Sequence, residues 1–305
     1  MHKYFLVLLL LHVSNAFFTL QHSKCNVGIS KTSKSQLLTL SASASGASDT
    51  FKNQPSVQLI GESNNIKKTP DFLAAISYFG ATAVEFSLIM VFLHGLQITA
   101  KKITAKFPEV VLSTPGSIVT KIGLGLFFFF MSVRSRVFSP LDNSRPSASK
   151  QDPNFKRKTP NWMPPPLAFP IIWSSIALLR AISSVLVVTH TKTLLSPAIF
   201  SFFLHLSVGD TWNTINNQEK RLGTAVLGVL AVWSSVVYAV KQYYTTFPLA
   251  GKLLAPSAVW ISVATVLVTT IWRLNYEDLG RPSLFPSKEE GPTCKWRLPF
   301  TSLNS

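Results

Sequence analysis

Long apolar stretches dominate the chain between residues 73 and 272. An α-helix needs about 20 apolar residues to cross a bilayer, and six stretches reach or approach that length. Lys121 interrupts the second stretch, and His205, Gly209 and Asp210 dilute the fourth. A lysine near a helix end can extend to the headgroups, so Lys121 does not exclude a span. The pattern predicts an all-α membrane protein with helices at 73–97, 116–133, 167–189, 194–214, 222–240 and 253–272.

A polar segment at 138–166, rich in Pro, Ser, Asn and Lys, separates the second predicted helix from the third. The last four helices follow one another through short connectors, so neighbours should pack antiparallel in a bundle. The alternation that a transmembrane barrel would show does not recur. The composition agrees with a membrane protein, because only 14% of residues are charged and the mean hydropathy is +0.29, whereas soluble domains carry about 25% charged residues.

The formal charge of +16 adds a preference for anionic surroundings. Lys and Arg lie mostly in the connectors and tails and form no continuous basic helix, so we predict no nucleic-acid partner. Anionic lipid headgroups are the expected counter-charge. The loops richer in Lys and Arg share one side with the C-terminus, which should face the cytosol or stroma. Cys25 and Cys294 have no metal-ligand spacing, so neither a zinc site nor a disulfide framework is predicted.

The N-terminal region has the features of a targeting sequence. A basic start, an apolar run and Ser14-Asn15-Ala16 predict a signal peptide over 1–16, and the Ser-rich segment 17–50 lacks acidic residues until Asp49. This order resembles the bipartite presequence of algae whose plastids have extra membranes. The alternative is a secretory signal followed by a Ser-rich spacer in a secretory-pathway membrane protein. Residues 51–115 form an extension carrying the extra helix 73–97, and the Pro-containing tail 276–305 is predicted to be mostly disordered.

Tryptophan is concentrated in the last four predicted helices and their entrances. Trp212 and Trp272 fit the interfacial belt, where the amphipathic ring lies at headgroup level. Trp260 lies deeper, about 10 Å from the start of its predicted helix. Three prolines at 164–166 open the third helix, where a missing N–H costs little, and they place Trp162 at the mouth of the bundle.

Several of these residues form recognisable strings. They are Pro160-Asn161-Trp162-Met163-Pro164-Pro165, Phe169-Pro170 with Trp173, and Pro256, Trp260, Ala264, Thr265 with Ile271-Trp272-Arg273-Leu274-Asn275. In this order and spacing the chain resembles the tryptophan-rich sensory protein and translocator protein family (TspO/MBR) over residues 116–275. The resemblance implies a five-helix transmembrane bundle, commonly dimeric, with a cavity beneath the loop between its first and second helices. It also implies binding of porphyrins or, in some lineages, sterols and synthetic aromatic ligands.

The resemblance assigns ligand-binding roles to six residues, namely Trp162, Pro164, Pro165, Trp173, Trp260 and Ala264. Three departures alter the polar lining. Ser257 stands where the family has Tyr, Val268 stands where it has Asn, and Gly209 replaces another amide beside Asp210.

Four ionisable residues lie within predicted spans, where such residues usually face the protein interior or a wet cavity. Arg180 and Asp210 differ too much in depth to pair, whereas His205 or Glu85 could approach Arg180. His205 is either an axial ligand of porphyrin iron or, as we favour, a polar residue satisfied within the bundle. Asp210 is expected to bond Trp212 or the following turn. Asn216 with Glu219 matches a capping box that would start the next helix.

We therefore expect an integral membrane protein that binds a tetrapyrrole or similar flat apolar ligand for sensing, sequestration or transport. Porphyrin or haem is the cofactor class suggested, with lipids and a second copy of the chain as further partners. One alternative is an enzyme that degrades porphyrin in light through Trp162 and Trp260. Another is a lipid-handling or scaffold protein whose helix 73–97, with Glu85, docks a partner. Motifs for hydrolysis or phosphoryl transfer are not found, and no catalytic residue is assigned.

Overall fold

The computed structural model describes residues 68–106, 118–142, 157–291 and 293–297. The predicted presequence lies outside these residues. The main elements of the described part are six α-helices, α2 (Phe72–Lys106), α3 (Ile118–Arg134), α4 (Ala168–Thr191), α5 (Pro197–Asn213), α6 (Leu222–Thr246) and α7 (Pro248–Leu274). Three short elements accompany them, the 3₁₀ helices η3 (Ser135–Phe138) and η5 (Lys288–Glu290) and the π-helix η4 (Thr214–Gln218).

Five of the helices, α2, α3, α4, α6 and α7, are long and apolar enough to cross a membrane. Helix α5 has 17 residues and continues directly into the π-helix η4, so this helical segment runs to Gln218. The prediction of an all-α membrane bundle with one additional N-terminal helix is confirmed.

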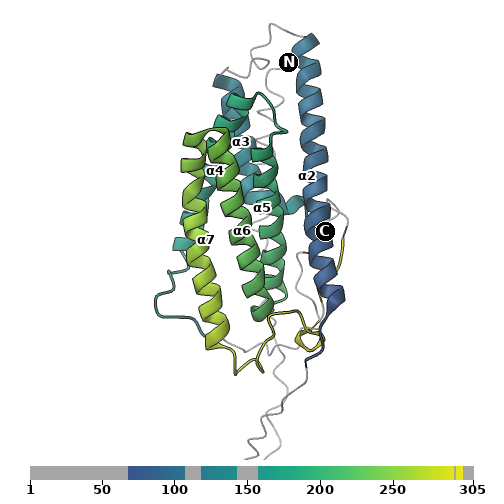
Figure 1. Cartoon of the computed structure of the whole chain (residues 1–305), viewed down its shortest axis with the longest axis vertical. Coiled ribbons are helices and arrows are strands. Elements are labelled where there is room, and N and C mark those ends of the chain that lie inside the picture. The colour runs from purple at the N-terminus through teal and green to yellow at the C-terminus, as the bar shows by residue number, and fades with distance from the viewer. Residues whose placement is uncertain (1–67, 107–117, 143–156, 292, 298–305) are drawn as a thin grey trace, which may run out of the picture. The chain divides into compact units, whose positions relative to one another are not determined.

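The α4–α5 and α6–α7 turns lie at the end of the bundle away from the 157–167 segment (Figure 1), and residues within each turn account for its conformation. Helix α4 ends where Lys192 adopts a left-handed conformation with φ 57°. Helix α5 begins at Pro197, with the Ser196 hydroxyl accepting a hydrogen bond from the Ile199 N–H at 3.3 Å. The turn between α6 and α7 requires Gly251, because a Cβ there would lie 2.5 Å from Cα of Tyr244.

Helix α6 lies between α5 and α7, while α4 contacts both α3 and α7 (Figure 1). The largest apolar core joins α3, α5 and α6 through buried aromatic rings. Phe202 and Phe203 meet edge to face with centroids 5.2 Å apart, and Phe128 and Tyr243 pack around them.

Helix α2 lies along the edge of the bundle against α5 (Figure 1). Its buried stripe recurs at helical spacing and comprises Ala74, Tyr78, Ala81, Glu85, Ile89 and Leu93. Two polar contacts fix its register: the hydroxyls of Thr82 and Thr211 are 2.8 Å apart, and Oε1 of Gln97 accepts from the Leu194 N–H at 2.8 Å. The extra helix is thus built into the bundle by specific contacts.

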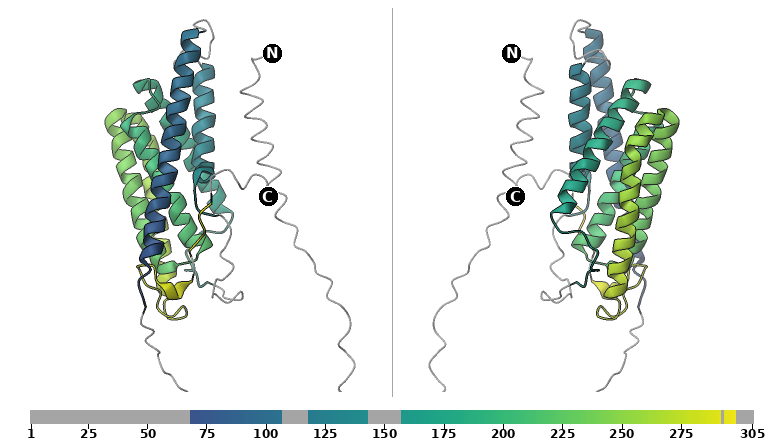
Figure 2. Two further views of the ribbon diagram at one scale, coloured as in Figure 1. Left: turned by 90° about the vertical axis from the view of Figure 1, so that its right-hand side faces the viewer. Right: turned by 90° about the vertical axis from the view of Figure 1, so that its left-hand side faces the viewer.

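The described residues of the C-terminal tail, 276–291 and 293–297, make backbone contacts with the rest of the chain, although their composition predicted disorder. Antiparallel bridges join Pro70 to Ser287 and Leu141 to Trp296. The tail therefore lies at the same end of the bundle as the start of α2 (Figure 2). Gly223 permits this approach, because a Cβ there would lie 2.1 Å from the Ser283 carbonyl oxygen. The composition of the tail alone predicts disorder, because the residues that bond its backbone, such as Pro70 and Leu141, are far away in the sequence.

A buried cluster, here called the junction cluster, connects the tail, α2 and the start of α6. It consists of Tyr78, Glu219, Arg221 and Cys294. The Glu219 carboxylate accepts from the Tyr78 hydroxyl and from the Cys294 N–H, the latter at 2.7 Å, and lies 3.3 Å from Nε of Arg221. Burial, reinforced by the Glu219 charge, raises the pKa of the Cys294 thiol to about 12.

The capping-box prediction is therefore wrong. Helix α6 begins at Leu222 without a side-chain cap, because Glu219 is used for contacts with α2 and the tail.

Candidate functional site

The segment before α4 is held against the end of α7 by one buried amide side chain. Asn275, fully buried, accepts from the Lys158 N–H at 2.8 Å and donates to the Lys158 carbonyl at 2.9 Å. A turn with Met163 N–H bonded to the Pro160 carbonyl follows, and Met163 then packs on α7. The motif asparagine thereby positions the loop over the α4–α7 interface.

One face of α7 carries Trp260, Ala264, Leu267 and Ile271, which recur at the spacing of a single helix face. Phe169, in the first turn of α4, packs against this face, and its ring meets that of Trp260 edge to face with centroids 6.2 Å apart. Nε1 of Trp260 is buried and has no hydrogen-bond partner in the described part of the chain. An unpaired buried indole N–H is uncommon and needs an explanation.

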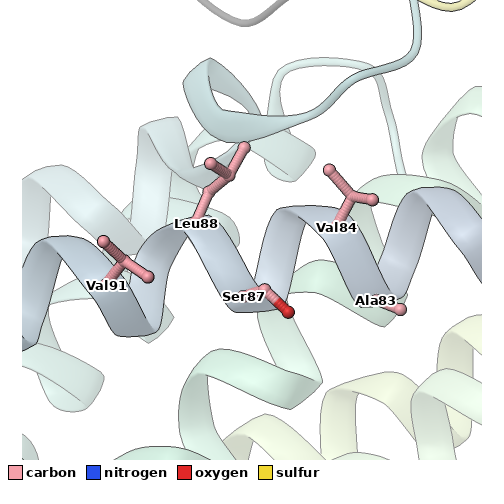
Figure 3. Close-up of a pocket in the computed structure, with 5 residues that line it drawn as sticks. All are labelled: Ala83, Val84, Ser87, Leu88 and Val91. Carbon is pink, nitrogen blue, oxygen red and sulfur yellow. The ribbon is translucent and has the colours of Figure 1, made fainter.

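The six predicted ligand residues differ in exposure. Trp260, Ala264 and Pro164 are partly buried at the α4–α7 interface or its entrance, whereas Pro165 is exposed. Trp162 and Trp173 are 49% and 36% exposed. The structure thus places Trp260 against Phe169. Phe169 belongs to the recognised motifs but was not among the six predicted ligand residues. A shallow apolar hollow formed by five residues of α2 shares none of these residues (Figure 3).

A hydrogen-bonded group of four side chains, here called the Arg180 network, joins α4, α5, α6 and α7. Arg180 donates from Nε to the Ser257 hydroxyl at 3.2 Å and from Nη2 to Nε2 of His205 at 2.9 Å. Nδ1 of His205 lies 3.0 Å from the Ser235 hydroxyl. Of the two partners suggested for Arg180, the structure selects His205. Both ring nitrogens of His205 have protein partners, which leaves neither for haem iron.

The other buried ionisable residues meet where α2 contacts α5. Glu85 is fully buried beside Asp210, Arg136 and Ser139. The Asp210 carboxylate accepts from the Ser135 hydroxyl at 2.6 Å. Of the two predicted partners of Asp210, the following turn is confirmed, because the Asp210 backbone carbonyl accepts from the Thr214 hydroxyl at 3.2 Å, whereas the Trp212 N–H donates to the Ala225 carbonyl. Because Glu85 faces the chain's own bundle, a partner docking on α2 could not reach it.

The fold and site define a multi-pass α-helical membrane protein with an aromatic site between α4 and α7, covered by the preceding loop. The TspO/MBR family model matches residues 128–273. Over these residues the chain is similar to the TspO/MBR family, as its motifs predicted. Helix α2 and the tail after residue 273 lie outside the match.

Three relatives illustrate the similarity. The chain is 29% identical over 122 residues to protein CrtK of Rhodobacter capsulatus, covering 39% of this chain and 75% of that one. It is 26% identical over 117 residues to the tryptophan-rich sensory protein of Cereibacter sphaeroides, covering 38% and 73%. It is 25% identical over 120 residues to the human translocator protein, covering 38% and 71%.

Proposed function

We propose that this protein binds a tetrapyrrole or similar flat apolar ligand between the 157–167 segment, α4 and α7, for sensing, sequestration or transport. The observation that carries the proposal is the buried, unpaired indole N–H of Trp260 beside the Phe169 ring. Leaving a buried donor unsatisfied costs about 1–3 kcal/mol. A ligand acceptor at this position would remove that cost, and the surrounding aromatic rings would stack on a flat apolar body.

The surrounding residues support the same location. Trp162 and Trp173 retain exposed ring surface at the entrance, and Pro164 and Pro165 restrict the backbone between them. Ala264, one turn after Trp260, is small enough to leave room beside that ring. The names of two relatives, translocator protein and tryptophan-rich sensory protein, agree with transport or sensing.

The test is titration of the detergent-solubilised protein with protoporphyrin IX, followed by the porphyrin absorption band. Trp260→Phe keeps an aromatic ring and removes the N–H, so we expect binding to weaken by about fivefold to a hundredfold. Trp233→Phe is the matched control, because Trp233 is 39% exposed and its N–H already donates to Ser262 at 2.8 Å.

Absence of porphyrin binding by the unaltered protein would reject the proposal, and equal effects of the two substitutions would reject the role of Trp260. Illumination of the same complex tests the enzymatic alternative, which requires loss of porphyrin absorbance that depends on Trp162 and Trp260.

A further inference from the structure

Arg180 is a cation in the middle of α4 that lacks an ionic partner. Its side chain is buried, with the residue 4% exposed. Among the described residues, no carboxylate oxygen lies within 4.0 Å of its guanidinium nitrogens. Nε and Nη2 donate to Ser257 and His205, which leaves the N–H bonds of Nη1 without an acceptor there. The guanidinium remains protonated in proteins.

The hydrogen-bond directions show that its neighbours are neutral. Because Arg180 can only donate, Nε2 of His205 must accept, and the ring proton is then on Nδ1. Nδ1–H donates to the Ser235 hydroxyl, which itself donates to the Val232 carbonyl at 2.7 Å. These hydrogen bonds are all satisfied when the His205 imidazole is neutral. The Arg180 network therefore carries one net positive charge, that of the guanidinium.

The buried acids belong to a different cluster. Asp210 receives the Ser135 hydrogen bond and lies beside Glu85, and Arg136 is the cation next to this pair. The Asp210 charge acts on Arg180 only from a distance greater than that of an ion pair. An unpaired cation at membrane depth is costly, and such residues usually mark a functional site.

Arg180 and Trp260 belong to the same interface. On α4, Arg180 shares a helix face with Phe169, Trp173 and Ile176, at i, i+4, i+7 and i+11. On α7, Ser257 contacts Arg180, and Trp260 follows it by one turn, about 4.5 Å along the axis. Two side chains with unused donors, the buried indole of Trp260 and the guanidinium of Arg180, therefore lie between α4 and α7.

We propose that Arg180 binds the carboxylate of an apolar ligand, with Nη1 donating to it and Trp260 contacting the ligand body one turn away on α7. A guanidinium matches a carboxylate in geometry and charge. This inference rests on the proposed function for the position of the ligand and adds its chemical class, an apolar molecule bearing an acid. Ser257 contributes because its hydroxyl accepts from Nε and orients the guanidinium.

The experiment compares protoporphyrin IX with its dimethyl ester, which has the same macrocycle without carboxylates. The unaltered protein should prefer the acid. Arg180→Gln should weaken binding of the acid about tenfold or more and leave binding of the ester unchanged. Arg180→Lys should keep a preference for the acid. Lys252→Gln, which removes the same charge from an exposed position on α7, should change neither affinity.

Gel filtration and thermal unfolding of each variant exclude misfolding as the cause. Equal affinity of the unaltered protein for acid and ester, unchanged by Arg180→Gln, would overturn the inference and leave the proposed function intact. If neither porphyrin binds, the proposed function fails, and oleate with oleyl alcohol then tests Arg180 alone. Selective binding of oleate that is lost in Arg180→Gln would support the carboxylate site, and equal binding of the acid and the alcohol would overturn it.

Discussion

The tryptophans show how residues of one type acquire different roles from their surroundings. Trp212 was predicted to be an interfacial anchor, but its N–H donates to the Ala225 carbonyl at 3.0 Å. Its ring packs so closely on α6 that a Cβ at Gly228 would lie 2.8 Å from it. Trp260 has no such acceptor. Sequence position gives the depth of an indole ring in the membrane, whereas the acceptor of its N–H depends on the neighbouring helix.

The ion pair of the junction cluster leads to a prediction about stability. The side chains of Glu219 and Arg221 are each 1% exposed. Arg221→Met removes the cation and leaves the carboxylate buried, so the free energy of unfolding should fall by about 3–5 kcal/mol. Equilibrium unfolding in detergent micelles measures the change.

Arg281→Met is the control for this prediction, because the pair of Arg281 with Glu277 is 52% and 73% exposed. Such a surface pair contributes about 0–1 kcal/mol. Similar losses in the two variants would contradict the importance of the buried pair.

At the scale of elements, the apolar pattern predicted helix α2 but could not predict its position. Hydropathy requires only that such a segment lie in the bilayer. Polar residues that face the bundle then fix its position, because a hydroxyl or carboxyl in hydrocarbon needs a partner. Thr82 finds Thr211, and Tyr78 finds Glu219, at the junction between η4 and α6. The C-terminal tail contacts the same junction, where the Cys294 N–H donates to Glu219, and composition alone could not predict this contact.

The position of α2 predicts a crosslink. In a background with Cys25→Ser and Cys294→Ser, Thr82→Cys with Thr211→Cys should oxidise readily, because the two native hydroxyl oxygens are 2.8 Å apart. Mass spectrometry of the digested protein detects the linked peptides. Ala83→Cys with Thr211→Cys is the control, since Ala83 is exposed on the outer face of α2. Equal yields from both pairs would mean that α2 does not hold this register.

For the whole molecule, the bundle has two distinct ends. The start of α2, the 157–167 segment, the junction cluster and the described tail lie at one end, and the α4–α5 and α6–α7 turns lie at the other (Figures 1 and 2). Three helices, α5, α6 and α7, separate Lys192 from Glu277. The short helix α5 therefore decides whether these two residues face opposite sides of the membrane.

Labelling with a membrane-impermeant maleimide tests this topology. In the same cysteine-free background, Lys192→Cys and Glu277→Cys should react from opposite faces of oriented vesicles, since an odd number of helices lies between them. Both side chains are exposed, so reactivity reports the side of the membrane. Labelling of both from one side would show that α5 does not cross.

The sequence by itself determined the approximate ends of the six α-helices of the described part, five of which are long and apolar enough to cross a membrane. Bilayer thickness sets the length of an apolar run, and the family motifs lie within short segments. Only the tertiary structure decided which polar groups meet. His205 reaches Arg180, Glu219 is used for α2 and the tail, and the Trp260 N–H is left unpaired. These outcomes depend on the rotation and depth of helices far apart in the chain, which hydrophobic periodicity leaves undetermined.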